Sequence, residues 1–473
     1  MVRRQLSRLF AGAALIGVAA CQVGPNYRGP PPGAVVNAPA ANGPFVSATP
    51  GVFSAEAAPD AWWRLYQSPE LDQLVSQAFA ANTDLRMAAA NLERSQALLR
   101  EAKASRQPTA EINFDPSYQQ LSAESYLHPG TLHPSGLYDT GLAVSYDLDL
   151  FGRLRRIVES ATAKDDAVKA AYDLARVNVA AETARAFADA CGAGEALLVA
   201  EHSLALQTQS TGITRRLVQG GRAAPLDAVR SEGQIAQIRS NIPGLEAQRR
   251  NALYRLATLT GHPPAEYPKA VELCVASPVL RRPVPVGDGA ALLRRRPDVR
   301  EAERDLAAAT ADIGVATADL YPRVTFGATI GSTGLLSDFL SGPTNRFGLG
   351  PGIVWEANRS LAHARVAEAN ATAKLALARF DGVVLTALRE TESALTSYRQ
   401  DLHRDGDLMT VQARAAQAEQ LSQRLYLGGK VGALSLLDAQ RTLADADAAL
   451  AASHGQLAAD QVAIFLALGG GWG

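Results

Sequence analysis

The side chains that most often carry chemistry are few in this sequence and lie far apart. Three cysteines occur, Cys21, Cys191 and Cys274, at spacings that suit neither a zinc site nor a disulfide framework. We expect Cys191 and Cys274 to be unpaired thiols, with Cys191 buried on a helix. Seven histidines occur, and none of them belongs to an HExxH or CxxC-like cluster.

The other signals of catalysis are also missing. The sequence contains no GxSxG motif, phosphate-binding loop or dinucleotide fingerprint. His128 and His133 share a proline-rich loop, where a metal contact is one interpretation and a solvent-exposed loop is the interpretation we prefer. Gly348, Gly350 and Gly352 recur with a period of two, which fits small residues facing a lumen. We therefore expect no enzymatic activity, no cofactor and no metal site.

Length and composition exclude several classes of protein. The 473 residues are enough for two or three domains. Charged residues make up 20% and apolar residues 47% of the chain, so neither a disordered protein nor a polytopic helical membrane protein fits. The 46 basic residues are balanced by 47 acidic residues, which argues against nucleic acid as a partner.

The first twenty residues read as an export signal. Three arginines precede an apolar run over residues 9–20, which is too short to span a bilayer. The run ends in Val18-Ala19-Ala20-Cys21, which resembles a bacterial lipobox, where the cysteine becomes the lipidated first residue of the mature chain. The alternative is ordinary cleavage after Ala20, which leaves Cys21 as a plain thiol. Residues 21–58 are rich in Pro, Gly and Ala and predict an extended, lipid-anchored tether.

The chain contains an internal duplication of about 210 residues. Three blocks recur in the same order, which chance does not explain. The matched blocks are 82–86 with 296–300 at an offset of 214, 216–226 with 424–434 at 208, and 259–261 with 468–470 at 209. We predict a first repeat over 59–265, a linker over 266–287, a second repeat over 288–470 and a short tail over 471–473.

Each repeat begins with a predicted helix and continues into two predicted strands. The helices cover 68–106 and 288–320 and stop before Pro108 and Pro322, since proline cannot continue a helix. Apolar residues then alternate with polar or small ones over 111–118, 138–147, 324–331 and 347–355, which predicts strands with one apolar face.

These strands fit either a half-buried hairpin or a lipid-facing barrel. Their length of about ten residues is that of a tilted transmembrane strand, and the aromatic side chains Tyr118, Tyr138, Tyr146 and Trp355 are candidates for interfacial girdles. Four strands cannot close a barrel alone, and a conducting barrel needs at least three copies of the chain.

Each repeat ends as a long helical hairpin. Proline-free stretches over 154–219 and 361–427 predict helices of about 100 Å. Glycine-rich turns at 220–225 and 428–433 reverse the chain into a returning helix of roughly 35 residues. A coiled-coil spacer is the alternative, but a spacer does not explain why the hairpins are joined to amphipathic strands.

The whole pattern resembles the outer-membrane efflux lipoproteins of the TolC-like outer-membrane factor group, in the OprM-type or NodT-type branch. The resemblance covers almost all of the mature chain. The residues that carry it are 21–27 (CQVGPNY), 62–66 (WWRLY) leading to Leu71, Asn82 and Leu85, 292–303 (LLRRRPDVREAE), 313–316 (IGVA) leading to Tyr321 and Pro322, and 436–441 (LLDAQR).

The resemblance implies a homotrimer that is mainly α-helical, with four transmembrane strands per subunit forming a twelve-stranded barrel above a periplasmic helical tunnel. It implies export of drugs, metals or other small molecules, an outer-membrane location, a periplasmic adaptor and an inner-membrane pump of the resistance-nodulation-division type. Gln22 after the lipobox favours the outer membrane. Export of peptides or proteins, or a lipid-anchored tether without a pore, are the alternative functions.

The resemblance also assigns roles at the hairpin tips. It implies that Leu434 forms an apolar gate ring, that Asp438 forms an acidic ring one turn deeper, and that Arg441 is a nearby partner. Asp227 occupies the duplicated position in the first repeat. The simpler interpretations are a capping box of Ser435 with Asp438, and a first-turn anion at Asp227. The residues expected to contact the adaptor are Gly220, Gly221, Arg222, Gly428, Gly429 and Lys430.

Overall fold

The computed structural model describes residues 22–127, 129–280, 282–356 and 358–470. The predicted signal peptide, Cys21, His128 and the predicted tail lie outside the described residues. The described chain forms two compact units. The first unit contains residues 22–30, 92–168 and 302–380, and the second contains residues 31–91, 169–301 and 381–470.

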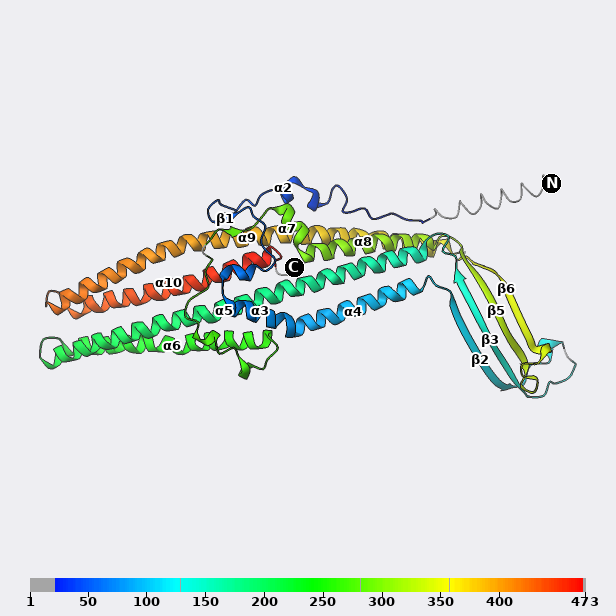
Figure 1. The fold of residues 1–473 in the computed structure, drawn as a ribbon, viewed down its shortest axis with the longest axis horizontal. Helices are drawn as coiled ribbons and strands as arrows, with labels where there is room; N and C mark the ends of the chain where they lie inside the picture. Colours follow the sequence, from blue (N-terminus) through cyan, green and yellow to red (C-terminus); the bar gives the residue numbers. More distant parts are fainter. Residues whose placement is uncertain (1–21, 128, 281, 357, 471–473) are drawn as a thin grey trace. The chain divides into compact units, whose positions relative to one another are not determined.

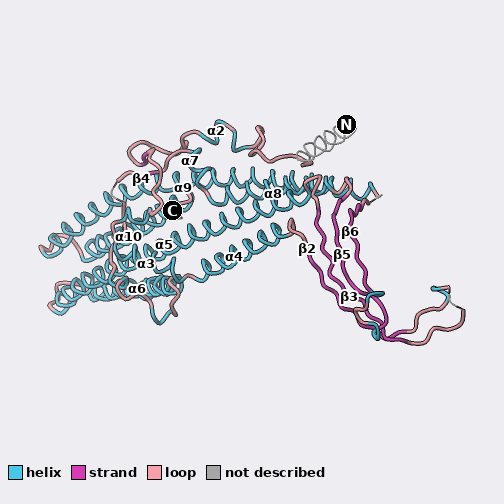
Figure 2. Tube along the Cα trace, turned by 45° about the vertical axis from the view of Figure 1, so that its right-hand side comes forward, coloured by secondary structure: helices cyan, strands magenta, loops and turns pink. Residues whose placement is uncertain are grey.

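The first unit contains a four-stranded antiparallel sheet (Figures 1 and 2). Its strands are β2 (Thr109–Gln119), β3 (Ser135–Asp147), β5 (Arg323–Leu335) and β6 (Asn345–Val354), in the order β2-β3-β5-β6. All four strands predicted from the period of two are confirmed. The two repeats each contribute a hairpin, and the hairpins join where β3 pairs with β5.

The strand register gathers the predicted apolar positions on one face. Ile112 is opposite Leu142, Leu142 is opposite Ile330, and Ile330 is opposite Phe347, so one row crosses all four strands. Because side chains alternate along a strand, the whole apolar set follows that row. The opposite face holds the polar residues and the small Gly348, Gly350 and Gly352.

Each predicted first helix is in fact two helices. The first is divided at Asn82 into α3 (Pro69–Ala81) and α4 (Thr83–Ala104). The second is divided at Arg296 into α7 (Gly289–Arg295) and α8 (Pro297–Ala318). Arg296 has the extended backbone that a following proline imposes, while the Asn82 side chain accepts hydrogen bonds from the N–H groups of Asp84 and Leu85.

The two predicted hairpins are confirmed. In the first repeat, α5 (Arg153–Gln219) is followed by α6 (Pro225–Leu259), and in the second, α9 (Arg359–Leu427) is followed by α10 (Ala433–Ala467). Both returning helices have 35 residues. No helix in the described ranges combines the length and the apolar character needed to cross a membrane.

The two hairpin tips share one backbone geometry. Gly221 has φ +70° and Gly429 has φ +68°, a left-handed conformation that favours glycine. The N–H groups of Arg222 and Lys430 donate to the carbonyl oxygens of Leu217 and Leu425, at 2.8 Å in each case. These bonds close the ends of α5 and α9 in the manner of Schellman caps.

The core of the second unit lies where the hairpin helices meet the shorter elements. Trp62 is fully buried and stacks on Phe465 of α10 with ring centroids 4.8 Å apart. Leu253 and Leu256 of α6 and Leu395 of α9 belong to the same cluster. Small side chains of α5, such as Ala180 and Ala184, let its neighbours approach closely.

The predicted extended tether is wrong for residues 31–58, because these residues fold onto the second unit. They form η2 (Val35–Asn37), α2 (Pro39–Asn42) and β1 (Phe53–Ser54), which pairs in parallel with β4 (Val284–Pro285). Phe45 and Phe53 are buried in its core. The composition of this segment resembles a linker, but its few apolar residues have partners that lie far away in the sequence.

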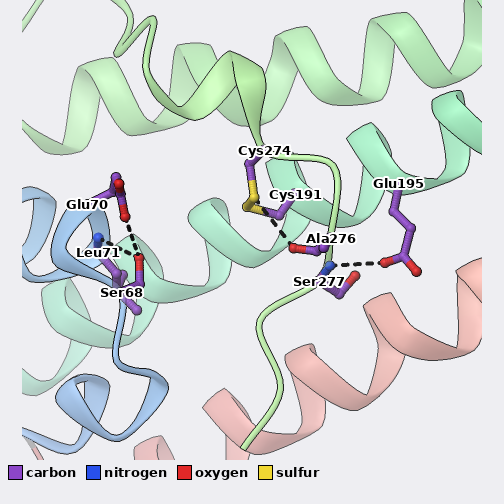
Figure 3. The surroundings of a disulfide bond; sticks show 8 residues. All are labelled: Ser68, Glu70, Leu71, Cys191, Glu195, Cys274, Ala276 and Ser277. Carbon is purple, nitrogen blue, oxygen red and sulfur yellow. Dashed lines mark hydrogen bonds between the residues drawn. A yellow bond between two sulfur atoms is a disulfide. The ribbon is translucent and has the colours of Figure 1, made fainter.

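The prediction of two free thiols is also wrong. Cys191 of α5 and Cys274 form a disulfide with Cα atoms 4.9 Å apart, although 83 positions separate them in the sequence (Figure 3). The spacing of cysteines cannot reveal this pairing, because it depends on the path by which residues after α6 return to the middle of α5.

Candidate functional site

The sheet of the first unit has one face of exposed apolar side chains. Ile112 is 81% exposed, Phe347 is 88% exposed and Leu349 is 71% exposed. The other exposed members of this face are Phe114, Tyr118, Leu142, Tyr146, Phe326, Ile330 and Ile353. In water such a surface costs about 25 cal/mol per Å² of apolar area. A continuous apolar patch over four strands therefore marks a surface that contacts lipid or another protein.

The opposite face carries a polar network that joins all four strands. Asp139 of β3 accepts hydrogen bonds from Asn113 of β2 at 2.9 Å, Thr333 of β5 at 2.7 Å and Arg346 of β6 at 2.7 Å. Arg346 also donates to the Thr333 hydroxyl at 2.9 Å. Charged and hydroxylated groups fill this face, so it suits contact with water.

The four aromatic residues predicted for interfacial girdles lie near the ends of the strands, and three of them are exposed. Tyr118, Tyr146 and Trp355 are exposed, but Tyr138 is only 2% exposed. The loop after β5 covers it: Phe339 lies 4.8 Å from the Tyr138 ring, and the Leu340 N–H donates to its hydroxyl. Tyr138 is therefore a buried anchor for that loop and not a girdle residue.

The second hairpin tip carries an exposed leucine and an exposed carboxylate. Leu434 is 58% exposed and Asp438 is also exposed. Among the described residues, the Asp438 carboxylate has no hydrogen-bonding or ionic partner, and Arg441 instead lies 3.9 Å from Asp445. The alternative capping box is wrong, because α10 begins after Gly432 and no side chain caps it.

The first hairpin tip differs in the use of its carboxylate. Asp227 accepts a hydrogen bond from the Ala224 N–H at 3.3 Å, so it caps the first turn of α6. Leu226, which aligns with Leu434 at the offset of 208, is exposed. The structural role predicted for Asp227 is confirmed, and its role in a pore stays a prediction.

His133 is exposed in the loop between β2 and β3, which agrees with the interpretation of a solvent-exposed loop.

A groove runs along the second unit between α5, α6 and α10. Its volume is 1560 Å³, and its walls include Arg185, Arg230, Arg255, Arg441 and Asp445. Near the tip-proximal part of α10, Gln440 donates to the Ser210 hydroxyl of α5 at 3.0 Å. Gln440 thus joins the second hairpin to the first, a role that its sequence motif did not reveal.

The arginine-rich motif at the start of the second repeat is a structural joint. Arg295 binds the Ala58 carbonyl and pairs with Asp60. Arg296 is buried and pairs with Asp298 at 2.6 Å and Glu390 at 3.0 Å. Burial lowers the pKa of Arg296, but these two carboxylates outweigh burial, so its pKa is raised and it stays charged.

The joint is duplicated in the first repeat. Arg296 donates to the Ala467 carbonyl near the end of α10 at 2.8 Å, and Asn82, its counterpart, donates to the Leu259 carbonyl at the end of α6 at 3.1 Å. In both repeats, therefore, the break between the first two helices holds the end of the returning helix.

Comparisons with known proteins place this architecture in a family. The family model "Outer membrane efflux protein" matches residues 74–262 and 290–470. The chain therefore belongs to the outer membrane efflux protein family, whose members are outer-membrane channels of efflux systems and are not enzymes.

Relatives of the chain are named for different processes. The chain is 29% identical over 468 residues to "Nodulation protein T" of Rhizobium leguminosarum bv. viciae, covering 98% of this chain and 94% of the relative. It is 30% identical over 484 residues to "Antibiotic efflux pump outer membrane protein ArpC" of Pseudomonas putida, covering 99% and 96%. The solved outer-membrane channel OprN matches with a TM-score of 0.87 and 34% identity, covering 96% of this chain and 100% of OprN.

Proposed function

We propose that this chain is the outer-membrane duct of a tripartite efflux system and that three copies join their sheets into a twelve-stranded barrel. The observation that carries the proposal is the strand register, which gathers the apolar residues of four strands on one largely exposed face. In the sheet of the described chain, β2 and β6 are edge strands. Open sheet edges are not tolerated in lipid, so β6 of one copy needs β2 of the next.

The polar face then lines the barrel. Asp139, Arg346 and the small glycines of β6 face water, and the long hairpins continue the passage on the periplasmic side as a tunnel. The duct conducts passively, and small molecules such as drugs or metals are the proposed cargo. A relative named for antibiotic efflux favours small molecules over proteins as the cargo.

The hairpin tips are the proposed gate and docking surface. Leu434 supplies an apolar ring, Asp438 an acidic ring, and Arg441 and Asp227 flank them. The exposed carboxylate of Asp438, which no partner in the described chain neutralises, supports this role, since three symmetry-related carboxylates would attract cations. The six residues Gly220, Gly221, Arg222, Gly428, Gly429 and Lys430 are the proposed contacts for the periplasmic adaptor, which links the duct to an inner-membrane pump of the resistance-nodulation-division type.

We also propose that Cys21 carries the lipid anchor. The residues after it are held beside the sheet end of α5. Arg156, which is fully buried, donates to the carbonyl oxygens of Val23 at 3.1 Å and Gly24 at 3.0 Å. Gln22 packs against Gly152 at the start of α5. Acyl chains on the preceding residue would enter the bilayer beside the barrel. Mass spectrometry of the mature amino terminus tests this anchor.

The proposed function is tested with the purified full-length protein in planar bilayers. We expect discrete single-channel currents, and a trimer that dissociates only on heating in detergent. A monomer without channel activity would favour the tether function and contradict the duct. Export of peptides instead of small molecules would appear as unchanged antibiotic sensitivity in a strain that lacks the chain.

A further inference from the structure

The cross-link between Cys191 and Cys274 belongs to a segment that crosses α5, here called the first strap (residues 271–277). The strap lies directly on the helix. A Cβ atom added to Gly194 would overlap the carbonyl oxygen of Cys274, and one added to Gly192 would lie 3.4 Å from the Ser277 hydroxyl. The two glycines therefore provide the flat surface that brings Cys274 to Cys191 (Figure 3).

Polar contacts extend the first strap to the second repeat. The Ser277 N–H donates to one Glu195 carboxylate oxygen at 3.0 Å. The other oxygen of Glu195 lies 2.6 Å from Nδ1 of His454 on α10. Glu195 therefore links the strap, α5 and α10, and the disulfide is the only covalent cross-link between these segments among the described residues.

The second repeat has a strap at the equivalent level, but it is not covalent. Because α5 and α9 run unbroken to their tips, the offset of 208 that relates Gly220 to Gly428 also relates Cys191 to Arg399. The second strap (residues 45–49) crosses α9 there. Glu392 accepts from the N–H groups of Val46 at 2.7 Å and Ser47 at 2.9 Å, and Arg399 donates to the Thr49 hydroxyl at 3.3 Å.

We propose that the Cys191–Cys274 disulfide is installed outside the cytoplasm by a thiol–disulfide oxidoreductase, and that it is the lock that fixes the first strap to α5. Two cysteine thiols lose two protons and two electrons as the S–S bond forms, and the disulfide of the oxidoreductase accepts them and opens to a dithiol. The expectation that the protein meets an oxidising environment rests on the proposed outer-membrane location. The lock itself does not require that the protein conducts.

The lock closes a large covalent loop. Its chain contains the tip-proximal part of α5, the tip at Gly220–Gly221–Arg222 and all of α6. Linking residues so far apart in sequence restricts the unfolded chain strongly. The first hairpin is thus held at its base by a bond that reductant can open, whereas the second hairpin is held by hydrogen bonds that reductant leaves intact.

The first test counts thiols in the full-length protein purified from outer membranes. The denatured protein is treated with a maleimide polymer before and after reduction. We expect reduction to add two labels, whatever the state of Cys21, because Cys191 and Cys274 become free together. Labelling of both positions without reduction would overturn the proposal.

The second test measures the temperature at which the assembled protein dissociates in detergent. Reductant should lower this temperature by about 5 °C in the wild type and leave the Cys191→Ala/Cys274→Ala double variant unchanged. The matched control is Arg399→Ala, which weakens the second strap and should keep the response to reductant. An equal response in the double variant, or none in the wild type, would overturn the lock. Channel currents are recorded separately, so loss of conduction contradicts the proposed duct and not the lock.

Discussion

Asp438 is an exposed carboxylate one turn beyond an exposed leucine at the second tip, and no partner in the described chain neutralises it. We expect Asp438→Asn to lower the cation-over-anion permeability ratio of the channel severalfold and to raise the resting leak, because a neutral amide removes three negative charges from a trimeric ring. Reversal potentials in planar bilayers under a salt gradient measure the ratio.

Asp445 offers the matched control for that experiment. It is also an exposed carboxylate on α10, but it lies within 3.9 Å of Arg441. Asp445→Asn should change the permeability ratio less than Asp438→Asn does. If the two variants behave alike, the assignment of Asp438 to the narrowest part of the duct is wrong.

Arg441→Ala should raise the leak of large antibiotics without reversing the selectivity.

Asp460 of α10 is a buried carboxylic acid in the helical part of the molecule. Burial, the largest cause, and the neighbouring Asp401 raise the pKa of Asp460, whereas Gln456 and Arg185 lower it, and the net result is a pKa of about 6. Gln456 donates to one oxygen at 2.8 Å, and the other oxygen has no partner among the described residues. Ionisation of this group therefore costs free energy in the folded state.

The sign of the pH dependence follows from this raised pKa. The folded protein binds more protons than the unfolded chain between the ordinary carboxyl pKa and about pH 6, so the free energy of unfolding falls as the pH rises through this window. The loss is about 1–2 kcal/mol after allowance for solvent screening. We expect the thermal midpoint in detergent to be higher at pH 5 than at pH 8 and Asp460→Asn to reduce this difference. An unchanged difference would contradict the role of Asp460.

At the scale of elements, the duplicated joint between the first two helices holds each returning helix. Asn82 is buried, caps α4 through the N–H groups of Asp84 and Leu85, and donates to the Leu259 carbonyl. We expect Asn82→Ala to destabilise the protein by about 2 kcal/mol, because it removes a helix cap and leaves a buried carbonyl unpaired. Thermal denaturation in detergent measures this loss, and Thr83→Ala, at an exposed neighbour, should have little effect.

The periodic elements could be predicted from sequence because each one obeys a local rule. The alternation around Ile112 and Phe347 predicted strands, and the register then placed those residues on one face. The glycines at 221 and 429 predicted the hairpin tips, where a left-handed residue is required. The break at Arg296 also had a local signal, the proline that follows it, but helical composition on both sides hid the break.

The remaining features could not be predicted because they depend on distant partners. Nothing near Cys191 indicates that a linker residue will lie against it. Tyr138 has the spacing of a girdle residue, and only the path of the loop after β5 shows that it is buried beneath Phe339. Residues 31–58 have the composition of a tether, yet Phe45 and Phe53 enter a core built by helices from other parts of the sequence.

At the scale of the whole molecule, the proposed barrel needs one face of the sheet in lipid and the other in water. Adjacent residues of β6 test this: Leu349 belongs to the apolar face, and Gly350 belongs to the polar face with no heavy atom within 4 Å of an added Cβ. We expect Leu349→Lys to prevent assembly in the outer membrane, since a lysine facing lipid costs about 2–4 kcal/mol in each subunit.

Gly350→Lys is the matched variant, with the same new charge one residue away. It should assemble normally and shift the channel toward anions. Heat-modifiable migration of the protein in outer-membrane fractions shows assembly, and planar bilayer currents show selectivity. Equal assembly of the two variants would mean that neither face of the sheet contacts lipid.

The Cys191–Cys274 bond also decides what remains connected after the backbone is cut. A trypsin nick at Arg222, in the first tip, falls between the two cysteines, so both fragments stay joined and migrate as one species on a denaturing gel until reductant is added. A nick at Lys430, in the second tip, lies beyond both cysteines, and its fragments separate at once. Proteolysis at the first tip is therefore invisible on a non-reducing gel, whereas the same cleavage at the second tip yields two separate fragments.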